Sequence, residues 1–418
     1  MTHKTFHQFK DRDILEQLCN LRQLTFEITD TCNLNCKYCG YGKLYNHYDT
    51  RTNQRIDYQN AIGLIDYLVE LWNSNINYSH NKTVYIGFYG GEPLLNINFI
   101  KQIIEYIEKL PENQINFSFN ITTNGLLLDK YIDFLVEKDF NILISLDGNK
   151  NNNEYRINHS NENSFDNIYK NVKLIMEKHP YFFKQNIDFN SVLHNKNNVP
   201  DILDFFKKEF NKTPQIAELS TSGIRKDKIQ EFKNMFNNKH NSILKSKEHH
   251  KISKELFFQN PNTAELGIFL MQYSGNVFSE YNQLLLPNNE NKPIPTGTCL
   301  PFGKKMFVTV NSKILVCERI SHQYSVGEIT KGKVMLDFQE IADKYNNYYR
   351  PFTTQCTQCY KLKTCTQCIF SMETKDKKPY CRYFMNKEKF EEYASSMMDH
   401  LRENPELYEK IMTEVTIS

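Results

Sequence analysis

From Leu24 to Ser220 the sequence alternates short runs of β-branched and aromatic residues with longer amphipathic segments. The short runs predict six strands, at Leu24–Thr29, Val84–Phe88, Asn116–Ile121, Ile142–Leu146, Ile187–Val192 and Gln215–Leu219. Apolar residues at three- and four-residue spacings predict helices between them, at Tyr58–Asn73, Phe99–Leu110, Lys130–Lys138, Phe165–Lys178 and Val199–Phe210. Six β–α repeats predict an α/β fold with a helix-covered parallel sheet, either a partial (β/α)6 TIM-type barrel or a doubly wound sheet.

Both architectures bind ligands at the carboxyl ends of the strands. The unusual residues of this sequence fall there repeatedly. Three cysteines follow the first strand, and the runs after the next four strands are Tyr89–Pro93, Thr122–Gly125, Ser145–Gly148 and Leu193–Asn195. Glycine and asparagine also occur in ordinary turns, but turn chemistry does not explain the cysteines. The site is therefore expected at this edge of the sheet.

Cys32, Cys36 and Cys39 have C-x3-C-x2-C spacing. Thiolates are soft ligands, and a cube of iron and sulfide normally takes four of them. A tight loop with three thiolates leaves one iron with a free position. The alternative is a zinc knuckle, but structural zinc takes four ligands and the nearest other candidate, His47, has no defined spacing.

This loop resembles that of the radical SAM superfamily. There the free iron binds the amino and carboxylate groups of S-adenosylmethionine (AdoMet), which is cleaved to a 5′-deoxyadenosyl radical. The aromatic residue that the family places before the third cysteine is Tyr38 here. Gly90, Gly91, Glu92 and Pro93 look like the family's second motif, whose backbone and Glu hold the methionyl amino group. Glycines permit close backbone approach, and a carboxylate suits an ammonium.

The resemblance also implies four further residues of the cofactor site, for which the sequence gives less support. Ser145 and Arg156 align with contacts to the ribose and the carboxylate in peptide-modifying members, and arginine suits a carboxylate. The alternative for Arg156 is a surface arginine in an Asn-rich loop. Thr123 and Asn124 either contact the cofactor or only shape a turn. The Asn-rich stretches at 149–153 and 158–164 are expected to be permissive surface loops without a function.

A second group of cysteines lies towards the end of the sequence. Its seven members are Cys299, Cys317, Cys356, Cys359, Cys365, Cys368 and Cys381. Two C-x2-C pairs alone would suggest a zinc ribbon. Together with the upstream loop, the pattern resembles the SPASM domain, which carries two auxiliary 4Fe–4S clusters. With the cluster of the Cys32–Cys36–Cys39 loop, the resemblance implies three 4Fe–4S clusters. Three departures are Ser312, where the family often has glycine, the two-residue separation of Cys365 and Cys368, where the family usually has three, and the absence of an eighth cysteine.

The resemblance implies how these cysteines divide. Cys299, Cys317 and Cys368 would bind a first auxiliary cluster with one open iron, and Cys356, Cys359, Cys365 and Cys381 would close the second. The first cluster could bind a substrate thiolate or accept an electron. Cys19 is either an eighth ligand or a buried structural thiol. Glu318 matches the acidic general base of sulfatase maturases, and its alternative is a solvated pair with Arg319.

Composition adds mainly exclusions. A net charge of +2 gives no broad positive field for nucleic acid. The sequence shows neither a signal peptide at its start nor eighteen consecutive apolar residues, so no membrane segment and a cytoplasmic location are expected. Because the cytoplasm keeps thiols reduced, the eleven cysteines are expected to bind metal rather than form disulfides.

These features predict five ranges: an N-terminal extension (1–23), the radical SAM barrel (24–220), a connector (221–295), the SPASM domain (296–386) and a helical tail (387–418). The expected function is a peptide maturase that installs a thioether or carbon–carbon crosslink in a ribosomally made precursor. The alternatives are an anaerobic sulfatase-maturating enzyme and a non-catalytic zinc-binding module. Expected partners are the precursor peptide and an electron donor such as flavodoxin or ferredoxin. Because some 23 residues precede the first strand, leader recognition is expected to need the 221–295 segment, the C-terminal tail or a separate leader-binding protein.

Overall fold

The computed structural model describes residues 6–79, 82–111, 115–259, 261–273, 293–375 and 378–414. The chain splits into two compact units. The barrel unit contains Ile14–Ile252 and Leu300–Phe338, and the cysteine-rich unit contains Met1–Asp13, Ser253–Cys299 and Gln339–Ser418. Residues 300–338 thus belong to the barrel unit, and the five ranges expected from the sequence stay a prediction.

Six parallel strands of the barrel unit lie side by side in chain order. They are β1 (Gln23–Thr29), β2 (Thr83–Gly90), β3 (Asn116–Thr123), β4 (Asn141–Ser145), β5 (Ile187–Leu193) and β6 (Gln215–Glu218). Successive residues of a strand face opposite ways. Phe26 and Phe189 face outwards and are buried, whereas Thr25 and Asn190 line a cavity on the other face. The expected parallel α/β fold is confirmed.

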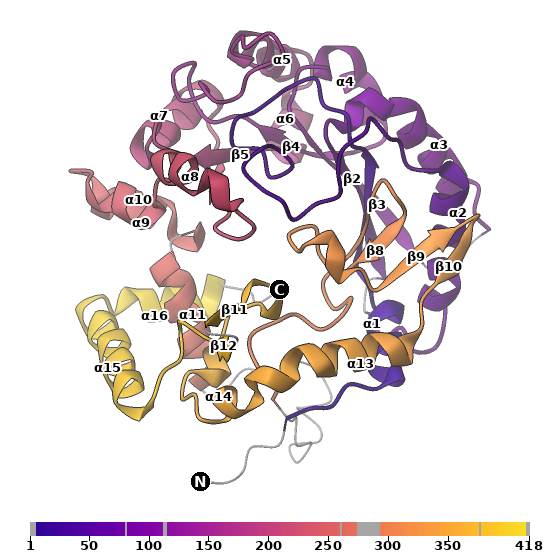
Figure 1. Cartoon of the computed structure of the whole chain (residues 1–418). Coiled ribbons are helices and arrows are strands. Elements are labelled where there is room, and N and C mark those ends of the chain that lie inside the picture. Colours follow the sequence, from indigo (N-terminus) through magenta and orange to yellow (C-terminus); the bar gives the residue numbers. More distant parts are fainter. Residues whose placement is uncertain are drawn as a thin grey trace. The chain divides into compact units, whose positions relative to one another are not determined.

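Helices cover the outer face of these strands (Figure 1). They are α2 (Tyr58–Trp72), α3 (Ile97–Glu108), α4 (Leu128–Glu137), α5 (Phe165–Lys178) and α7 (Val199–Phe210), with α1 (Asp11–Cys19) before β1 and a short α6 (Pro180–Asn186) before β5. Phe99 of α3 packs edge-on against Phe26, and Phe206 of α7 packs against Phe189. Helix α2 begins where Asp57 accepts the backbone N–H of Asn60, and α7 ends at Asn211 in the left-handed conformation.

Four short strands extend the same sheet beyond β1, and the sequence did not predict them. They are β7 (Met306–Val308), β8 (Lys313–Leu315), β9 (Gly327–Thr330) and β10 (Lys333–Met335). Strand β7 pairs parallel with β1, and the others follow as antiparallel neighbours, so the sheet has ten strands within the described ranges. Ser312, where the family often has glycine, lies in the β7–β8 turn with φ +61°, a conformation that glycine adopts without strain.

The cysteine-rich unit is built mainly from helices. It contains α11 (Pro261–Tyr273), α14 (Thr353–Thr357), α15 (Lys387–Glu403), α16 (Glu406–Glu414) and the hairpin of β11 (Glu373–Lys375) and β12 (Lys378–Tyr380). Leu266 and Leu270 of α11 pack with Ile411 of α16 and Leu401 of α15. Helices α15 and α16 lie within the range expected to be a helical tail, 387–418, of which the structure describes residues up to 414. The connector holds α8 (Ile229–Met235), α9 (Lys239–Leu244) and α10 (His249–Glu255), and α13 (Phe338–Tyr349) follows β10.

Candidate active site

A cavity of about 780 Å³ opens within the barrel unit, on the inner face of the strands. The residues predicted to bind AdoMet and its cluster gather in its wall. Those that line it are Cys32, Cys36, Tyr38, Cys39, Gly90, Gly91, Thr123, Asn124, Ser145 and Arg156. Glu318 also lines it, from the loop that follows β8. Sequence motifs spread over almost 300 residues thus meet at one cavity, as the rule for strand carboxyl ends predicts.

The cysteine loop is fastened to the Asn-rich segment, defined here as residues 149–164. The backbone N–H of Asn35 donates to the carbonyl of Ile157 at 2.7 Å, and that of Lys37 donates to the carbonyl of Tyr155 at 3.0 Å. The imidazole Nε2 of His159 donates to the carbonyl of Cys32 at 2.9 Å. Residues 149–151 and 159–162 are exposed, as expected of surface loops, whereas Asn152, Asn153 and residues 155–157 between the two stretches are buried.

Asparagine side chains build the Asn-rich segment from within. Asn153 is fully buried, and its Oδ1 accepts the backbone N–H of Asp147 at 3.3 Å. Its Nδ2 donates to Oδ1 of Asn163 at 3.2 Å and to Oγ of Ser164 at 3.3 Å. Asparagine amides satisfy backbone groups in tight turns where water is excluded. In the sequence these asparagines suggest a loop without a fixed conformation, but in the structure their side chains fix the conformation of the loop by hydrogen bonds.

The donor set of the cysteine loop fits an iron–sulfur cluster. Burial raises the pKa of the Cys32 thiol to about 11 and that of Cys36 to about 12. A bound cation reverses this preference, because a coordinating thiol is deprotonated. The backbone N–H of Leu34 donates to Sγ of Cys32 at 3.4 Å. Within the described ranges no three Cys, His, Asp or Glu side chains gather closely enough to hold a single metal ion. Thiolates around an iron–sulfur cube stand farther apart than ligands of one ion.

Glu92 does not line the cavity, although the resemblance implies a direct contact with AdoMet. Its side chain is fully buried, and Oε1 accepts the hydroxyl of Thr123 at 2.7 Å and the backbone N–H of Leu94 at 3.1 Å. Oε2 accepts the backbone N–H of Asn124 at 2.7 Å. Burial raises the pKa of Glu92, and these hydrogen bonds lower it by less than burial raises it. Glu92 therefore joins the end of β3 to the turn after β2, and Gly90 and Gly91 are the members of the motif that reach the cavity.

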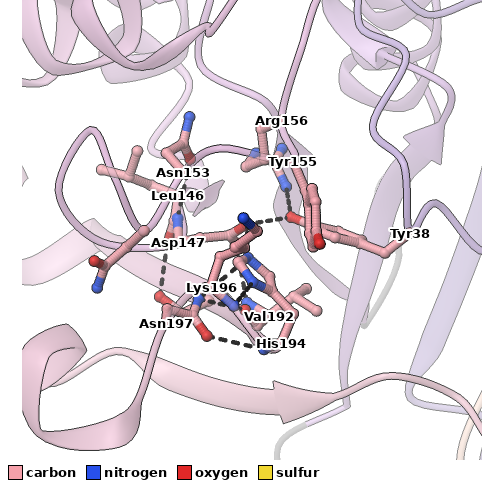
Figure 2. A network of polar contacts seen from close by, with 12 residues as sticks. Tyr38, Leu146, Asp147, Asn153, Tyr155, Arg156, Val192, His194, Lys196 and Asn197 are labelled. Atoms are coloured by element: carbon pink, nitrogen blue, oxygen red, sulfur yellow. Dashed lines mark hydrogen bonds and ion pairs between the residues drawn. The ribbon is translucent and has the colours of Figure 1, made fainter. Parts of the chain in front are cut away.

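Tyr38 is the centre of a buried polar network (Figure 2). Its hydroxyl donates to Oδ2 of Asp147 at 2.5 Å and accepts Nη1 of Arg156 at 3.0 Å. Burial raises the pKa of Tyr38 well above its ordinary value, so the hydroxyl keeps its proton. His194 stacks on the Tyr38 ring, with 5.7 Å between centroids, and its Nε2 lies 3.6 Å from Oδ2 of Asp147. Arg156 is thus buried in the cavity wall rather than free on the surface.

Glu318 pairs with a residue that the sequence did not suggest. Each of its carboxylate oxygens lies 3.2 Å from Nζ of Lys305, whereas Nε of Arg319 lies 3.7 Å away and Arg319 is 86% exposed. Burial is the largest influence and raises the pKa of Glu318, but Lys305, a backbone N–H and Arg319 together lower it below the ordinary value. The main ion pair of Glu318 is therefore the half-buried one with Lys305 and not the solvated pair with Arg319 that was the expected alternative. The carboxylate is ionised and faces the cavity.

A second cavity, of about 370 Å³, lies in the cysteine-rich unit. Cys356, Cys359, Cys365 and Cys381, the set expected for the second auxiliary cluster, all line it. Of the other set, Cys299 and Cys368 belong to this unit and Cys317 to the barrel unit, so the first auxiliary cluster remains a prediction. Cys19 is fully buried, and its Sγ lies 3.5 Å from the hydroxyl of Ser74. Its surroundings are those of a structural thiol.

Three residues of this site were given no role from the sequence: Asp147, His194 and Lys305. Asp147 lies two residues after the end of β4, and His194 directly follows β5. Their place at strand carboxyl ends was the signal that could have identified them. Lys305 precedes a three-residue strand in a region without recognisable periodicity, so the sequence carried no comparable signal.

Comparison with known proteins agrees with this site. Residues 26–208 match the family model of the radical SAM superfamily. The radical SAM cyclopropyl synthase TigE of Paramaledivibacter caminithermalis is 27% identical over 52% of this chain and 44% of its own length. The cysteine-type anaerobic sulfatase-maturating enzyme of Clostridium novyi is 29% identical over 46% of this chain and 49% of its own length. The chain thus spans about half the length of these curated relatives.

Solved structures show the same fold over more of the chain. The structure of anSMEcpe with bound AdoMet has a TM-score of 0.61 at 16% identity and covers 94% of this chain and 100% of its own. The structure of anSMEcpe with AdoMet and the Cp18Cys peptide has a TM-score of 0.58 at 18% identity, with coverages of 94% and 99%. At this identity the likeness establishes the fold and not the substrate. Residues 26–208 of this chain are a domain of the radical SAM superfamily.

Proposed function

We propose that this protein is a radical SAM peptide maturase with three 4Fe–4S clusters, which installs a thioether or carbon–carbon crosslink in a ribosomally made precursor. One observation carries the proposal. The three thiols of the cysteine loop and the ionised carboxylate of Glu318 line the same cavity. A group that would generate a radical and a group that can take a proton therefore face the same cavity.

The residues around the cysteine loop support AdoMet binding. When bound, the cluster and AdoMet supply a 5′-deoxyadenosyl radical that removes a hydrogen atom from the substrate. Cys32, Cys36 and Cys39 would hold the cluster. Gly90 and Gly91 present backbone without side chains to the cavity, and a side chain on Gly91 would collide with the backbone of Thr31, so only glycine fits there.

Ser145 and Arg156 supply polar groups on the other side of the cavity. The guanidinium of Arg156 is buried and cationic, which suits the AdoMet carboxylate. Thr123 and Asn124 act on the cavity through Glu92, and Nδ2 of Asn124 also donates to Oδ1 of Asn33 in the cysteine loop at 2.7 Å. We propose that the hydrogen-bonded groups of these two residues hold the cavity wall in place and do not contact AdoMet directly.

Glu318 is the proposed general base. Forming a thioether from a C–H and an S–H group releases a hydrogen atom, a proton and an electron. The carboxylate of Glu318 would take the proton, and Lys305 keeps the carboxylate ionised and oriented. We assign the electron to the auxiliary clusters that the seven cysteines of the second group would hold.

A peptide substrate is supported by the fold. The solved structure of anSMEcpe, which shares it, contains the Cp18Cys peptide beside AdoMet. We further propose that flavodoxin or ferredoxin donates the electron for AdoMet cleavage, and that a separate protein binds the leader of the precursor. No helix in the described ranges is both long and apolar enough to cross a bilayer.

An anaerobic sulfatase-maturating activity, which converts Cys or Ser to formylglycine, is the second candidate. The similarity to the Clostridium novyi enzyme and the fold of anSMEcpe favour it. The absence of an eighth cysteine in the second group favours the crosslinking enzyme. A non-catalytic zinc-binding module, the third alternative, predicts a colourless protein that contains zinc.

The proposal is tested with protein reconstituted under anaerobic conditions. With dithionite, the wild type should cleave AdoMet to 5′-deoxyadenosine, and a C32A/C36A/C39A variant should not while it keeps the iron of its other cysteines. Cleavage by that variant would refute the radical SAM assignment. Mass spectrometry of Cys-containing peptides then separates the two activities, because a crosslink removes two hydrogens whereas formylglycine formation removes the sulfur.

A further inference from the structure

Arg156 and Asp147 carry opposite charges, and both hydrogen-bond to the hydroxyl group of Tyr38. They do not contact each other. Nη1 of Arg156 donates to the hydroxyl oxygen of Tyr38 at 3.0 Å, and the same hydroxyl donates to Oδ2 of Asp147 at 2.5 Å. In the part of the chain that the structure describes, no ion pair joins Arg156 to any carboxylate. Figure 2 shows the neutral phenol between the two charged groups.

The remaining contacts of the two side chains differ. Asp147 is fully buried, and its Oδ1 accepts the backbone N–H of Val192 at 3.0 Å while Oδ2 faces Nε2 of His194 at 3.6 Å. Arg156 is 6% exposed and lines the cavity, and its buried Nε has no hydrogen-bond partner. Buried donors are rarely left without a partner in native proteins. Because this Nε is shielded from solvent, a ligand oxygen in the cavity would reach the guanidinium through its Nη atoms instead.

The phenol decides how much of the arginine's charge is available. Direct contact between a guanidinium and a carboxylate is usually bidentate and consumes several donors, so the arginine would be partly neutralised. A neutral hydroxyl takes one donor and leaves the charge intact. It also fixes the direction of the guanidinium, because it is itself held by Asp147 and by the ring of His194.

We propose that Tyr38 is a spacer that keeps Arg156 apart from Asp147, and that Tyr38 and Asp147 are positioning residues for the recognition of a carboxylate by Arg156. The carboxylate is that of AdoMet, so the inference rests on the assignment of Arg156 under the proposed function. The structure gives Tyr38 this task through its hydroxyl, in addition to the contact that its ring makes with the cavity.

The spacer makes an unusual prediction for two substitutions. In Tyr38→Phe the hydroxyl is lost, Arg156 pairs directly with Asp147, and the dissociation constant of AdoMet should rise by roughly 10- to 100-fold, the size expected for a hydrogen bond to a charged group. In Tyr38→Phe/Asp147→Asn the competing carboxylate is gone, so at least about tenfold of that affinity should return. A residue that only stabilises the fold predicts the opposite, a double variant that binds worse than either single variant.

The experiment is equilibrium dialysis of AdoMet with reconstituted holoenzyme in the absence of oxygen, with iron content and thermal unfolding recorded for every variant. 5′-Methylthioadenosine, which lacks the amino-acid portion, serves as the matched ligand, and its affinity should not change in Tyr38→Phe. If Arg156→Gln leaves AdoMet affinity unchanged, the assignment of Arg156 itself fails. If Arg156→Gln weakens binding but the double variant does not recover affinity over Tyr38→Phe, the spacer is refuted and the assignment of Arg156 stands.

Discussion

The side chain of Asn153 accepts the backbone N–H of Asp147, at 3.3 Å, with both residues fully buried. This hydrogen bond joins the Asn-rich segment to the polar network around Tyr38. The same segment holds the backbone of the cysteine loop at Asn35 and Lys37. The backbone of the cysteine loop and the polar network around Tyr38 therefore depend on one turn, and the energetics of that turn can be measured.

Asn153→Ala should destabilise the protein by about 1–3 kcal/mol, because it leaves the buried N–H of Asp147 without an acceptor. Chemical denaturation gives this value. The variant should also lose iron faster to a chelator, since the cysteine loop rests on this segment. Asn151→Ala is the matched control, because Asn151 is an exposed residue of the same turn. Equal iron loss from the two variants would contradict the role given to Asn153.

Gly91→Ala should abolish AdoMet binding or weaken it by more than about tenfold. A Cβ at this position would lie 2.2 Å from the carbonyl oxygen of Thr31, and backbone cannot move away cheaply. Gly40→Ala is the control beside the same loop, since its Cβ would meet only Cε2 of Tyr48, at 4.0 Å. Dialysis with AdoMet measures both. Normal binding by Gly91→Ala would show that the backbone there does not approach the ligand.

Lys305→Met should shift the pH dependence of peptide modification and leave AdoMet cleavage without peptide unchanged. Lys305 lowers the pKa of Glu318, so the base remains ionised to a lower pH in the wild type. Without the ammonium, burial raises that pKa, and the rate should begin to fall at a higher pH as the medium is acidified. Lys305→Arg should keep the wild-type profile. An unchanged profile in Lys305→Met would argue against Glu318 as the base.

Cys381→Ala should lose the iron and visible absorbance of one cluster, because Cys381 lines the cavity of the cysteine-rich unit with three other cysteines. Cys19→Ala should keep the full iron content of the wild type, since Cys19 is fully buried beside Ser74. Iron analysis of the two reconstituted variants checks both statements. Iron loss from Cys19→Ala would identify Cys19 as the eighth ligand.

The sequence predicted the parts of the fold that have local periodicity. The six parallel strands and the helices between them begin and end within a few residues of their expected bounds, for example α7 at Val199–Phe210. Helical spacing and short β-branched runs are properties of neighbouring residues, so they can be read without tertiary contacts. The cysteine loop and the Gly90–Gly91 pair were identified for the same reason, because each motif is contiguous.

Tertiary structure decided the features that depend on contacts between residues distant in the sequence. Strands β7 to β10 have only three or four residues each, and they join the sheet because β7 pairs with β1, between residues about 280 apart. Lys305 meets Glu318, and Tyr38 separates Arg156 from Asp147, only because the sheet brings distant loops to one edge. The sequence thus determined the six parallel strands, the helices between them and the spacing of the three cysteines. The burial and partners of Arg156, Glu92 and Glu318 are set by packing, because a side chain's charge acts only on what the fold places beside it.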